Sequence, residues 1–215
     1  MQSVKNAIVF SGGEVNNLMQ TASLIPEDAF VVCADSGVYN CEKLKYKANI
    51  IVGDFDSSVL EEVKNLTCAE NAQIVKLNPI KDDTDTEHCL DILVKEGFTN
   101  IYIVGAIGTR MDHTLANVFL MEKYHKQGAD IIVVNENNIV HFLTEATLEL
   151  SKNSMKYVSV VPLEDVTISN NGFKYPLNNE TLIRYSSRGI SNELSSDKGS
   201  ITISKGCALI IESID

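Results

Sequence analysis

Short apolar runs alternate with longer mixed segments from the start of the chain to about Val134. Two of the intervening segments, Thr84–Glu96 and Met111–His125, repeat apolar residues at helical spacing. Near-continuous runs of valine and isoleucine separated by helices are typical of a mostly parallel sheet with helices on both faces. We therefore predict an α/β region with about six strands. The apolar runs are Ala7–Phe10, Ala29–Cys33, Ile50–Val52, Gln73–Leu77, Ile101–Val104 and Ile131–Val134.

The pattern changes after Asn135, where β-rich pieces replace the helical segments. These pieces recur every 8 to 12 residues or so, with turn residues such as Asn171-Gly172 between them, as in a small antiparallel sandwich or barrel. We therefore predict two domains, an α/β domain over residues 1–140 and a C-terminal antiparallel β-sandwich over residues 141–215. The pieces are Asn138–Thr144, Ala146–Lys152, Tyr157–Leu163, Asp165–Gly172, Thr181–Ser187, Gly199–Ser204 and Cys207–Ser213.

Composition and charge narrow the class of protein. The 215 residues are 44% apolar and 22% charged, as in ordinary globular proteins. The net charge of −11 disfavours nucleic acid as a partner, and no apolar stretch is long enough to span a membrane. The apolar run at Ala7–Phe10 is too short for a secretory signal, so we expect a cytoplasmic protein. Five scattered cysteines without CxxC spacing predict reduced, mostly buried thiols.

Glycines and polar residues follow the predicted strands. In an open parallel sheet, ligands bind outside the carboxyl ends of the strands, so we expect these loops to converge on one site. The first loop matches neither common glycine-rich phosphate motif, and both a phosphate loop and a tight turn stay open, with the turn favoured. Asp35 in the second loop is a cleft residue or a helix cap. The loops are Ser11–Glu14, Asp35–Gly37, Gly53–Ser57, Lys81–Asp85 and Gly105–His113.

Two carboxylates, Asp54 and Asp56, flank Phe55 at the end of the third run. In an extended segment both acids point to one face, about 6.6 Å apart along the strand, with Phe55 on the other. Like charges so close repel unless a cation lies between them. An aspartate-nucleophile phosphatase is an alternative, because Asp-x-Asp follows an apolar run.

A second acidic cluster precedes the helical segment at Thr84–Glu96. Thr84 and Glu87 fit a capping box, which accounts for part of the cluster. Mg²⁺ prefers carboxylate oxygens and bridges to substrate phosphates, so we favour a metal site over capping alone. The four acids are Asp82, Asp83, Asp85 and Glu87.

The segment that begins at Thr109 predicts an amphipathic helix, with Thr109 as a possible cap. On a helix, Arg110, His113 and Asn117 fall within about 60° of one another, which suits a phosphate or a substrate hydroxyl; a solvated face is the alternative. Ser-His-Asp catalysis has little support, since no GxSxG is present. A separate face carries the apolar residues Met111, Leu115, Val118 and Phe119.

Five segments in order resemble the thiamine pyrophosphokinase (thiamine diphosphokinase) family. They are CADSG (33–37), GDFDS (53–57), KDDTDTEHCL (81–90), the TRMDHTLAN stretch (109–117) and SSRGISNEL (186–194). The resemblance covers nearly the whole chain. It implies a nucleotide- and metal-binding α/β domain and a thiamine-binding β-sandwich. The implied reaction transfers a diphosphoryl group from ATP to the hydroxyl of thiamine and releases AMP. The implied assembly is a homodimer with active sites at the subunit interface.

The resemblance also implies roles for individual residues. Some family members have a tryptophan beside thiamine, where this chain has Tyr175. The resemblance implies that Mg²⁺ is bound by Asp54, Asp56, Asp82 and Asp85, and that these four acids, Arg110 and Asp112 are catalytic. The residues implied to bind the nucleotide are Asp35, Ser36, Gly37, Arg110, His113 and Asn117. The residues implied to bind thiamine are Tyr175, Ser191 and Asn192. The candidates for the general base are Asp82 and Asp112. Another metal-dependent hydrolase or nucleotide transferase, or a non-catalytic sensor, are the alternative functions.

Overall fold

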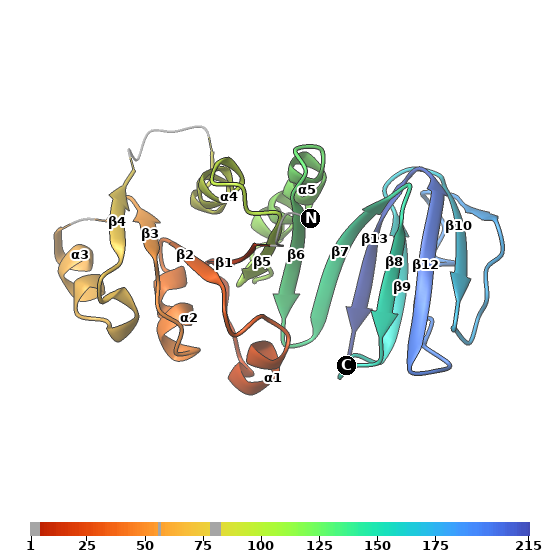
Figure 1. The fold of residues 1–215 in the computed structure, drawn as a ribbon, viewed down its shortest axis with the longest axis horizontal. Helices are drawn as coiled ribbons and strands as arrows, with labels where there is room; N and C mark the ends of the chain where they lie inside the picture. The colour runs from red at the N-terminus through yellow and green to blue at the C-terminus, as the bar shows by residue number, and fades with distance from the viewer. Residues whose placement is uncertain (1–4, 56, 78–82) are drawn as a thin grey trace. The chain divides into compact units, whose positions relative to one another are not determined.

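The computed structural model describes residues 5–55, 57–77 and 83–215. It divides into two compact units, residues 1–136 and 137–215. Figure 1 shows the course of the chain through both units. No helix in these ranges is both long and apolar enough to cross a membrane.

The first unit is an α/β structure, and each apolar run of the sequence is a strand of its sheet. The run lengths suit buried parallel strands, whose two faces are both covered. The strands are β1 (Asn6–Phe10), β2 (Phe30–Ala34), β3 (Ile50–Gly53), β4 (Gln73–Lys76), β5 (Asn100–Val104) and β6 (Asp130–Asn135). The helices are α1 (Leu18–Ser23), α2 (Gly37–Lys43), α3 (Ser57–Lys64), α4 (Asp85–Lys95) and α5 (Met111–His125), with a 3₁₀ turn, η1, at Thr67–Ala69.

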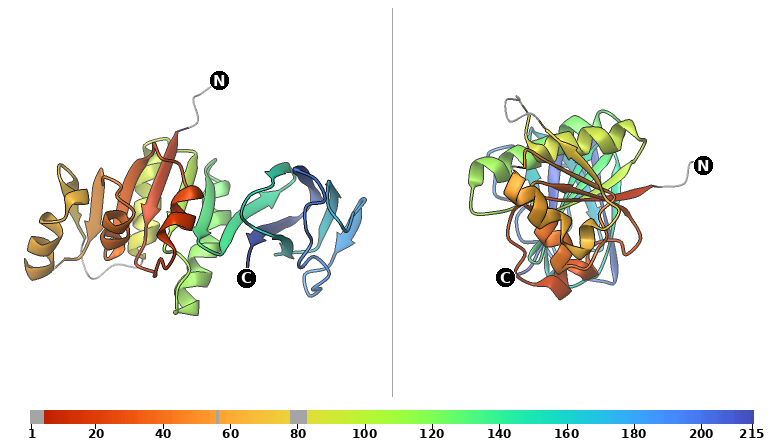
Figure 2. Two further views of the ribbon diagram at one scale, coloured as in Figure 1. Left: turned by 90° about the horizontal axis from the view of Figure 1, so that it is seen from below. Right: turned by 90° about the vertical axis from the view of Figure 1, so that its left-hand side faces the viewer.

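The strands of the first unit are parallel and lie in the order β4-β3-β2-β1-β5-β6. The chain moves in one direction from β1 to β4, then crosses back and moves in the other direction from β5 to β6. Because such crossovers are right-handed, α1 to α3 cover one face of the sheet, and α4 and α5 cover the opposite face. Figures 1 and 2 show the two layers of helices. The order reverses between β1 and β5, which is the switch point of the sheet.

Helix α4 begins as its sequence predicts. The Thr84 hydroxyl caps it by accepting a hydrogen bond from the Glu87 N–H at 3.2 Å. The carboxylate of Glu87 instead accepts from Lys123 of α5, at 2.8 Å. Tyr124 of α5 is fully buried and donates its hydroxyl to Asp91 of α4 at 2.6 Å. These bonds tie the two helices to each other on one face of the sheet.

Helix α5 has the predicted bounds, but two details differ from expectation. Arg110, not Thr109, stands at the capping position, so the Thr109 cap was wrong. The helix packs on the unit through Asn117, Met121 and Tyr124, which are buried. Its apolar face at Met111, Leu115 and Phe119 is exposed, at 67%, 45% and 59%.

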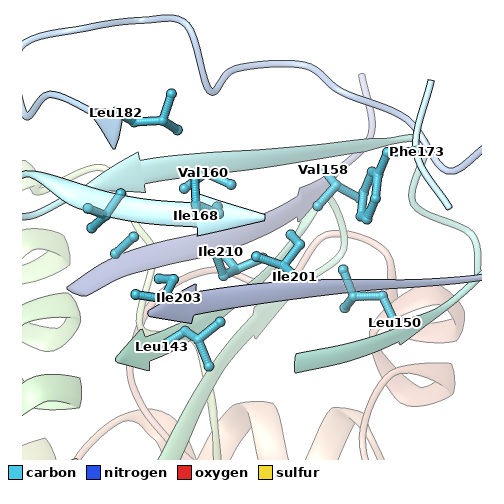
Figure 3. Close-up of a cluster of buried hydrophobic side chains, with 12 residues drawn as sticks. Leu143, Leu150, Val158, Val160, Ile168, Phe173, Leu182, Ile201, Ile203 and Ile210 are labelled. Carbon is cyan, nitrogen blue, oxygen red and sulfur yellow. The ribbon is translucent and has the colours of Figure 1, made fainter. Parts of the chain in front are cut away.

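The second unit is a β-sandwich, as the alternating β-rich pieces predict. Its strands pair antiparallel in two sheets, β7-β13-β9 and β11-β10-β12-β8. Aliphatic side chains and Phe173 fill the space between the sheets (Figure 3). The strands are β7 (Asn138–Thr144), β8 (Thr147–Ser151), β9 (Tyr157–Pro162), β10 (Val166–Asn171), β11 (Glu180–Leu182), β12 (Lys198–Lys205) and β13 (Cys207–Ser213).

The cysteines are buried and form no disulfide, as expected from their spacing. A hydrogen bond with Cys41 of α2, together with burial, raises the pKa of the Cys33 thiol well above its usual value. A protonated, buried thiol is a weak nucleophile, so Cys33 acts as a packing group.

Candidate active site

A cavity of about 400 Å³ lies at the carboxyl ends of β1, β2 and β5, beside the N-termini of α4 and α5. This is the switch point of the sheet, where open α/β folds bind their ligands. Several of the loops that follow the strands therefore do converge. The site residues expected from the sequence that line the cavity are Asp35, Ser36, Asp85, Arg110, His113 and Asn117.

The glycine loops beside the cavity approach each other through their backbones. The Ser11 N–H donates to the Val104 carbonyl at 2.8 Å, and the Gly13 N–H donates to the Gly105 carbonyl at 2.9 Å. A Cβ on Gly13 would lie 2.4 Å from the Gly105 oxygen. Gly105 has a φ of +77°, and a Cβ there would lie 2.3 Å from the Ser11 oxygen. Both glycines are needed for this close approach, and the first loop borders the cavity rather than only turning the chain.

Asp35 lines the cavity with its backbone in the left-handed region, at a φ of +48°. Ser36, not Asp35, is at the capping position of α2, so the capping alternative for Asp35 was wrong. A non-glycine residue held in this conformation stores strain, which proteins tend to keep at functional sites. Gly37 is not among the described residues that line the cavity. A Cβ on Gly37 would lie 1.9 Å from the Phe10 oxygen, so this glycine lets α2 begin close against β1.

The acids expected to bind metal are only partly placed. Asp85 lines the cavity with Asp83, and Asp54 is exposed just after β3, at the same edge of the sheet. Phe55 is buried against Gly53, away from solvent. The other two acids, Asp56 and Asp82, lie outside the described residues. Within the described residues, no group of three or more His, Cys, Asp or Glu side chains is arranged to hold a metal ion.

Arg110 and Asp112 form a bidentate ion pair at the N-terminus of α5. The Arg110 Nη2 and Nε atoms donate to the two Asp112 oxygens at 2.6 and 3.2 Å. The guanidinium, assisted by the His113 N–H, lowers the pKa of Asp112 to about 2. A carboxylate with so low a pKa is a poor general base at neutral pH, which argues against the base role for Asp112. Arg110 and His113 line the cavity; Asp112 is not among its described lining residues.

Two buried polar side chains, those of Asn117 and Thr86, fix the loops around this cavity. The buried Asn117 donates its Nδ2 to the Ala106 carbonyl at 3.0 Å and so fixes the loop after β5. Thr86 bonds Ser11 through their hydroxyls at 2.9 Å, which links α4 to the loop after β1. Sequence reasoning missed Thr86, because a threonine one position past a predicted helix start carries no signal of its own.

A second cavity, of about 280 Å³, lies within the β-sandwich unit and is bordered by Tyr175 and Asn192. The Asn192 amide is occupied by backbone: Nδ2 donates to the Tyr175 carbonyl at 2.8 Å, and Oδ1 accepts from the Tyr175 N–H at 3.1 Å. Asn192 therefore holds the Tyr175 segment. Ser191 is not among the cavity's lining residues; its N–H donates to the Ser159 hydroxyl at 3.0 Å. Arg188 also lines this cavity and pairs with Glu180. No role for Arg188 was predicted from the sequence.

The fold and the first cavity define the class of this protein: an α/β unit with a pocket at the switch point of a parallel sheet, followed by an antiparallel β-sandwich. Family models then narrow the class. The model described as "Thiamin pyrophosphokinase, catalytic domain" matches residues 21–133, and "Thiamin pyrophosphokinase, vitamin B1 binding domain" matches residues 145–208. The chain belongs to the thiamin pyrophosphokinase family.

Individual proteins agree with the family models. The thiamine pyrophosphokinase of Bacillus subtilis (strain 168) is 29% identical over 215 residues, which are 99% of this chain and 100% of the relative. A crystal structure of thiamine pyrophosphokinase from B. subtilis superposes with a TM-score of 0.86 at 26% identity, covering 98% of this chain and 100% of that one. The Geobacillus thermodenitrificans structure has a TM-score of 0.83 at 29% identity, covering 98% of both chains. The α/β and β-sandwich fold class expected from the sequence is confirmed.

Proposed function

We propose that this protein transfers a diphosphoryl group from ATP to the hydroxyl of thiamine, giving thiamine diphosphate and AMP. The main support for this proposal is the cavity at the switch point of the sheet. Glycine loops, carboxylates and Arg110 meet there, within the segment matched by the catalytic family model. The α/β domain, residues 1–140, is the proposed catalytic domain. The β-sandwich, residues 141–215, is the proposed thiamine-binding domain, and its cavity lies within the segment matched by the vitamin B1 model.

The proposed metal is Mg²⁺, held by Asp54, Asp56, Asp82 and Asp85. Two observations support the fit: Asp85 borders the cavity, and the exposed Asp54 follows a neighbouring strand at the same sheet edge. Carboxylate oxygens are the ligands that Mg²⁺ prefers. When bound, the ion neutralises phosphate charge during transfer.

The proposed chemistry is an in-line displacement at the β-phosphorus of ATP. The thiamine oxygen forms a bond to that phosphorus and loses its proton to solvent, the bond from the β-phosphorus to the α,β-bridging oxygen breaks, and AMP leaves with the electron pair. Phosphoryl transfer depends mainly on positioning and charge, so Arg110 binds phosphate oxygens while the loops fixed by Asn117 and Gly105 shape the cavity. The flat face of Tyr175, which is 67% exposed, is available to stack on a thiamine ring. Ser191 and Asn192 are the other proposed thiamine-binding residues; Asn192 borders the same cavity as Tyr175, and Ser191 precedes it in the chain.

One incubation tests the proposed function. The protein is mixed with ATP, Mg²⁺ and thiamine, and the products are identified by mass. We expect AMP and thiamine diphosphate in equal amounts, and no product when thiamine or Mg²⁺ is left out. Consumption of ATP without thiamine would instead identify another hydrolase or nucleotide transferase. Binding of thiamine or ATP without turnover would identify a sensor.

We further propose a cytoplasmic homodimer in which the active sites lie at the subunit interface. Five unbridged cysteines suit a reducing compartment. The exposed apolar face of α5, formed by Met111, Leu115 and Phe119, supports the dimer. Contiguous apolar side chains on one helix face are costly to leave in water, and burial against a second copy removes that cost.

Phe119→Asp is expected to convert the dimer to a monomer, because it buries a charge in the proposed interface. The measurement is molar mass by light scattering after gel filtration. Met19→Asp is the matched control: Met19 is 86% exposed on α1 and not on the α5 face, so this variant should remain dimeric. A monomeric wild-type protein, or a dimeric Phe119→Asp variant, contradicts the proposed interface.

A further inference from the structure

Asn40 of α2 is a buried polar residue that reaches the loop after β1. Its side chain is 5% exposed, and its neighbours Val38 and Cys41 are fully buried on the same short helix. The Asn40 Nδ2 atom donates to two backbone carbonyls, those of Ser11 and Gly13, each at 2.8 Å. Both hydrogens of the amide are thus used on one loop, and that loop borders the cavity at the switch point.

The bonds from Asn40 set the direction of the loop's peptide groups. In a trans peptide the C=O and the following N–H point in opposite directions. Because the Ser11 and Gly13 carbonyls turn toward Asn40, the N–H groups of Gly12 and Glu14 turn away from it. Gly12 borders the cavity. Two N–H groups turned to one side of a glycine loop are suited to an anion, whereas carbonyl oxygens on that side would repel one.

Neighbouring contacts hold the loop laterally, but they do not replace Asn40. The Ser11 hydroxyl bonds Thr86, and the Gly13 N–H bonds the Gly105 carbonyl. A Cβ on Gly12 would lie 2.3 Å from the Ser36 hydroxyl oxygen, which shows how closely the second loop packs. These contacts involve the Ser11 hydroxyl, the Gly13 N–H and the Cα of Gly12. Asn40, in contrast, binds the carbonyls of Ser11 and Gly13.

We propose that Asn40 is a positioning residue for the nucleotide: it turns the carbonyls of the loop after β1 inward so that the loop's N–H groups face the ATP phosphates. This inference rests on the proposed function, because it takes ATP as the ligand of the first cavity. It assigns no direct contact between Asn40 and ATP. The effect of Asn40 is therefore on binding of the nucleotide, not on binding of thiamine.

The test is the Asn40→Asp variant, which keeps the shape of the side chain and replaces its NH₂ donor by an acceptor. We expect the KM for ATP to rise about tenfold or more, the scale expected when buried carbonyls lose their donor. The KM for thiamine should change by less than about twofold, the scatter of a site that loses no contact. Hydrogen exchange of the segment 11–14, followed by mass spectrometry, should become faster.

Asn65→Asp is the matched control. Asn65 also donates its Nδ2 to a backbone carbonyl, that of Glu61 at 2.9 Å, but at an exposed site after α3. The same substitution adds the same charge there, and it should leave both KM values and exchange in segment 11–14 unchanged. Asn40→Ser, which buries no charge and is assayed well below its unfolding midpoint, should give an increase in the KM for ATP smaller than that of Asn40→Asp.

The possible outcomes separate this inference from the proposed function. Failure of the wild-type protein to make thiamine diphosphate refutes the function. A wild-type protein that turns over, with Asn40 variants that fold and keep the wild-type KM for ATP, overturns the inference alone. Should Asn40→Asp fail to fold, Asn40→Ser decides: equal increases in the KM values for ATP and thiamine would indicate a general structural role and overturn the positioning role.

Discussion

Replacing Asp54 by asparagine is expected to lower kcat about a thousandfold, the scale seen when a group that stabilises transition-state charge is lost. Asp54 is exposed after β3, so its carboxylate is not part of the core and its loss leaves the fold intact. Asparagine keeps the size of the side chain and removes the negative charge. Since Mg²⁺ is bound through charge and hard oxygen atoms, the apparent affinity for the metal should fall as well. The measurement is turnover as a function of Mg²⁺ concentration.

Asp28→Asn is the control for this experiment. Asp28 is also exposed, but it precedes β2 and so lies at the amino ends of the strands, whereas the cavity lies at their carboxyl ends. This variant should keep the wild-type kcat and the wild-type response to Mg²⁺. EDTA should abolish wild-type turnover, and added Mg²⁺ should restore it. Near-normal kcat in Asp54→Asn, at a Mg²⁺ concentration that half-saturates the wild-type protein, would refute the assignment of Asp54 to the metal.

The strands and long helices were predictable because local patterns determine them. Runs such as Ile101–Val104 are apolar on both faces, which only a covered parallel sheet accommodates. The register and order of those strands depend on contacts between distant segments, and no local pattern encodes them. Helix α5 shows the limit: its bounds follow from periodicity, yet the buried face is the one with Asn117, Met121 and Tyr124. Burial of that face depends on partners in α4 and in the loop after β5.

The site was predictable to the extent that strand ends lie together in a parallel sheet. Asp35, Asp85 and Arg110 meet around one cavity for that reason. What could not be predicted is how each side chain uses its hydrogen-bonding groups. Asn40 was missed because its two acceptors are 27 and 29 residues away along the chain. Asn192 belongs to a recognisable motif, but only the folded structure shows that its amide is bonded to Tyr175.

Arg110→Ala is expected to lower kcat/KM by about a hundredfold or more, because a guanidinium that stabilises charge on a transferred phosphoryl group is lost. Arg110→Lys should recover only part of the activity, since an ammonium cannot form two parallel hydrogen bonds. Arg110 is paired with Asp112. The phosphates would have to compete with this carboxylate for the guanidinium, or bind through the donors that it leaves.

Asp112→Asn separates the role of Arg110 from that of its partner. If Arg110 contacts ATP, removing the Asp112 charge frees the guanidinium, and kcat/KM should stay within about threefold of wild type, as for loss of an exposed ion pair. A loss as large as that of Arg110→Ala would instead assign the essential role to Asp112 or to the pair. The pKa of Asp112 gives an independent readout by NMR titration. Arg110 lowers this pKa to about 2, so in Arg110→Ala it should rise toward its ordinary value of 3.8. Asp112 is ionised at neutral pH in both the wild-type protein and Arg110→Ala. A loss of activity at neutral pH therefore results from the missing guanidinium and not from titration of Asp112.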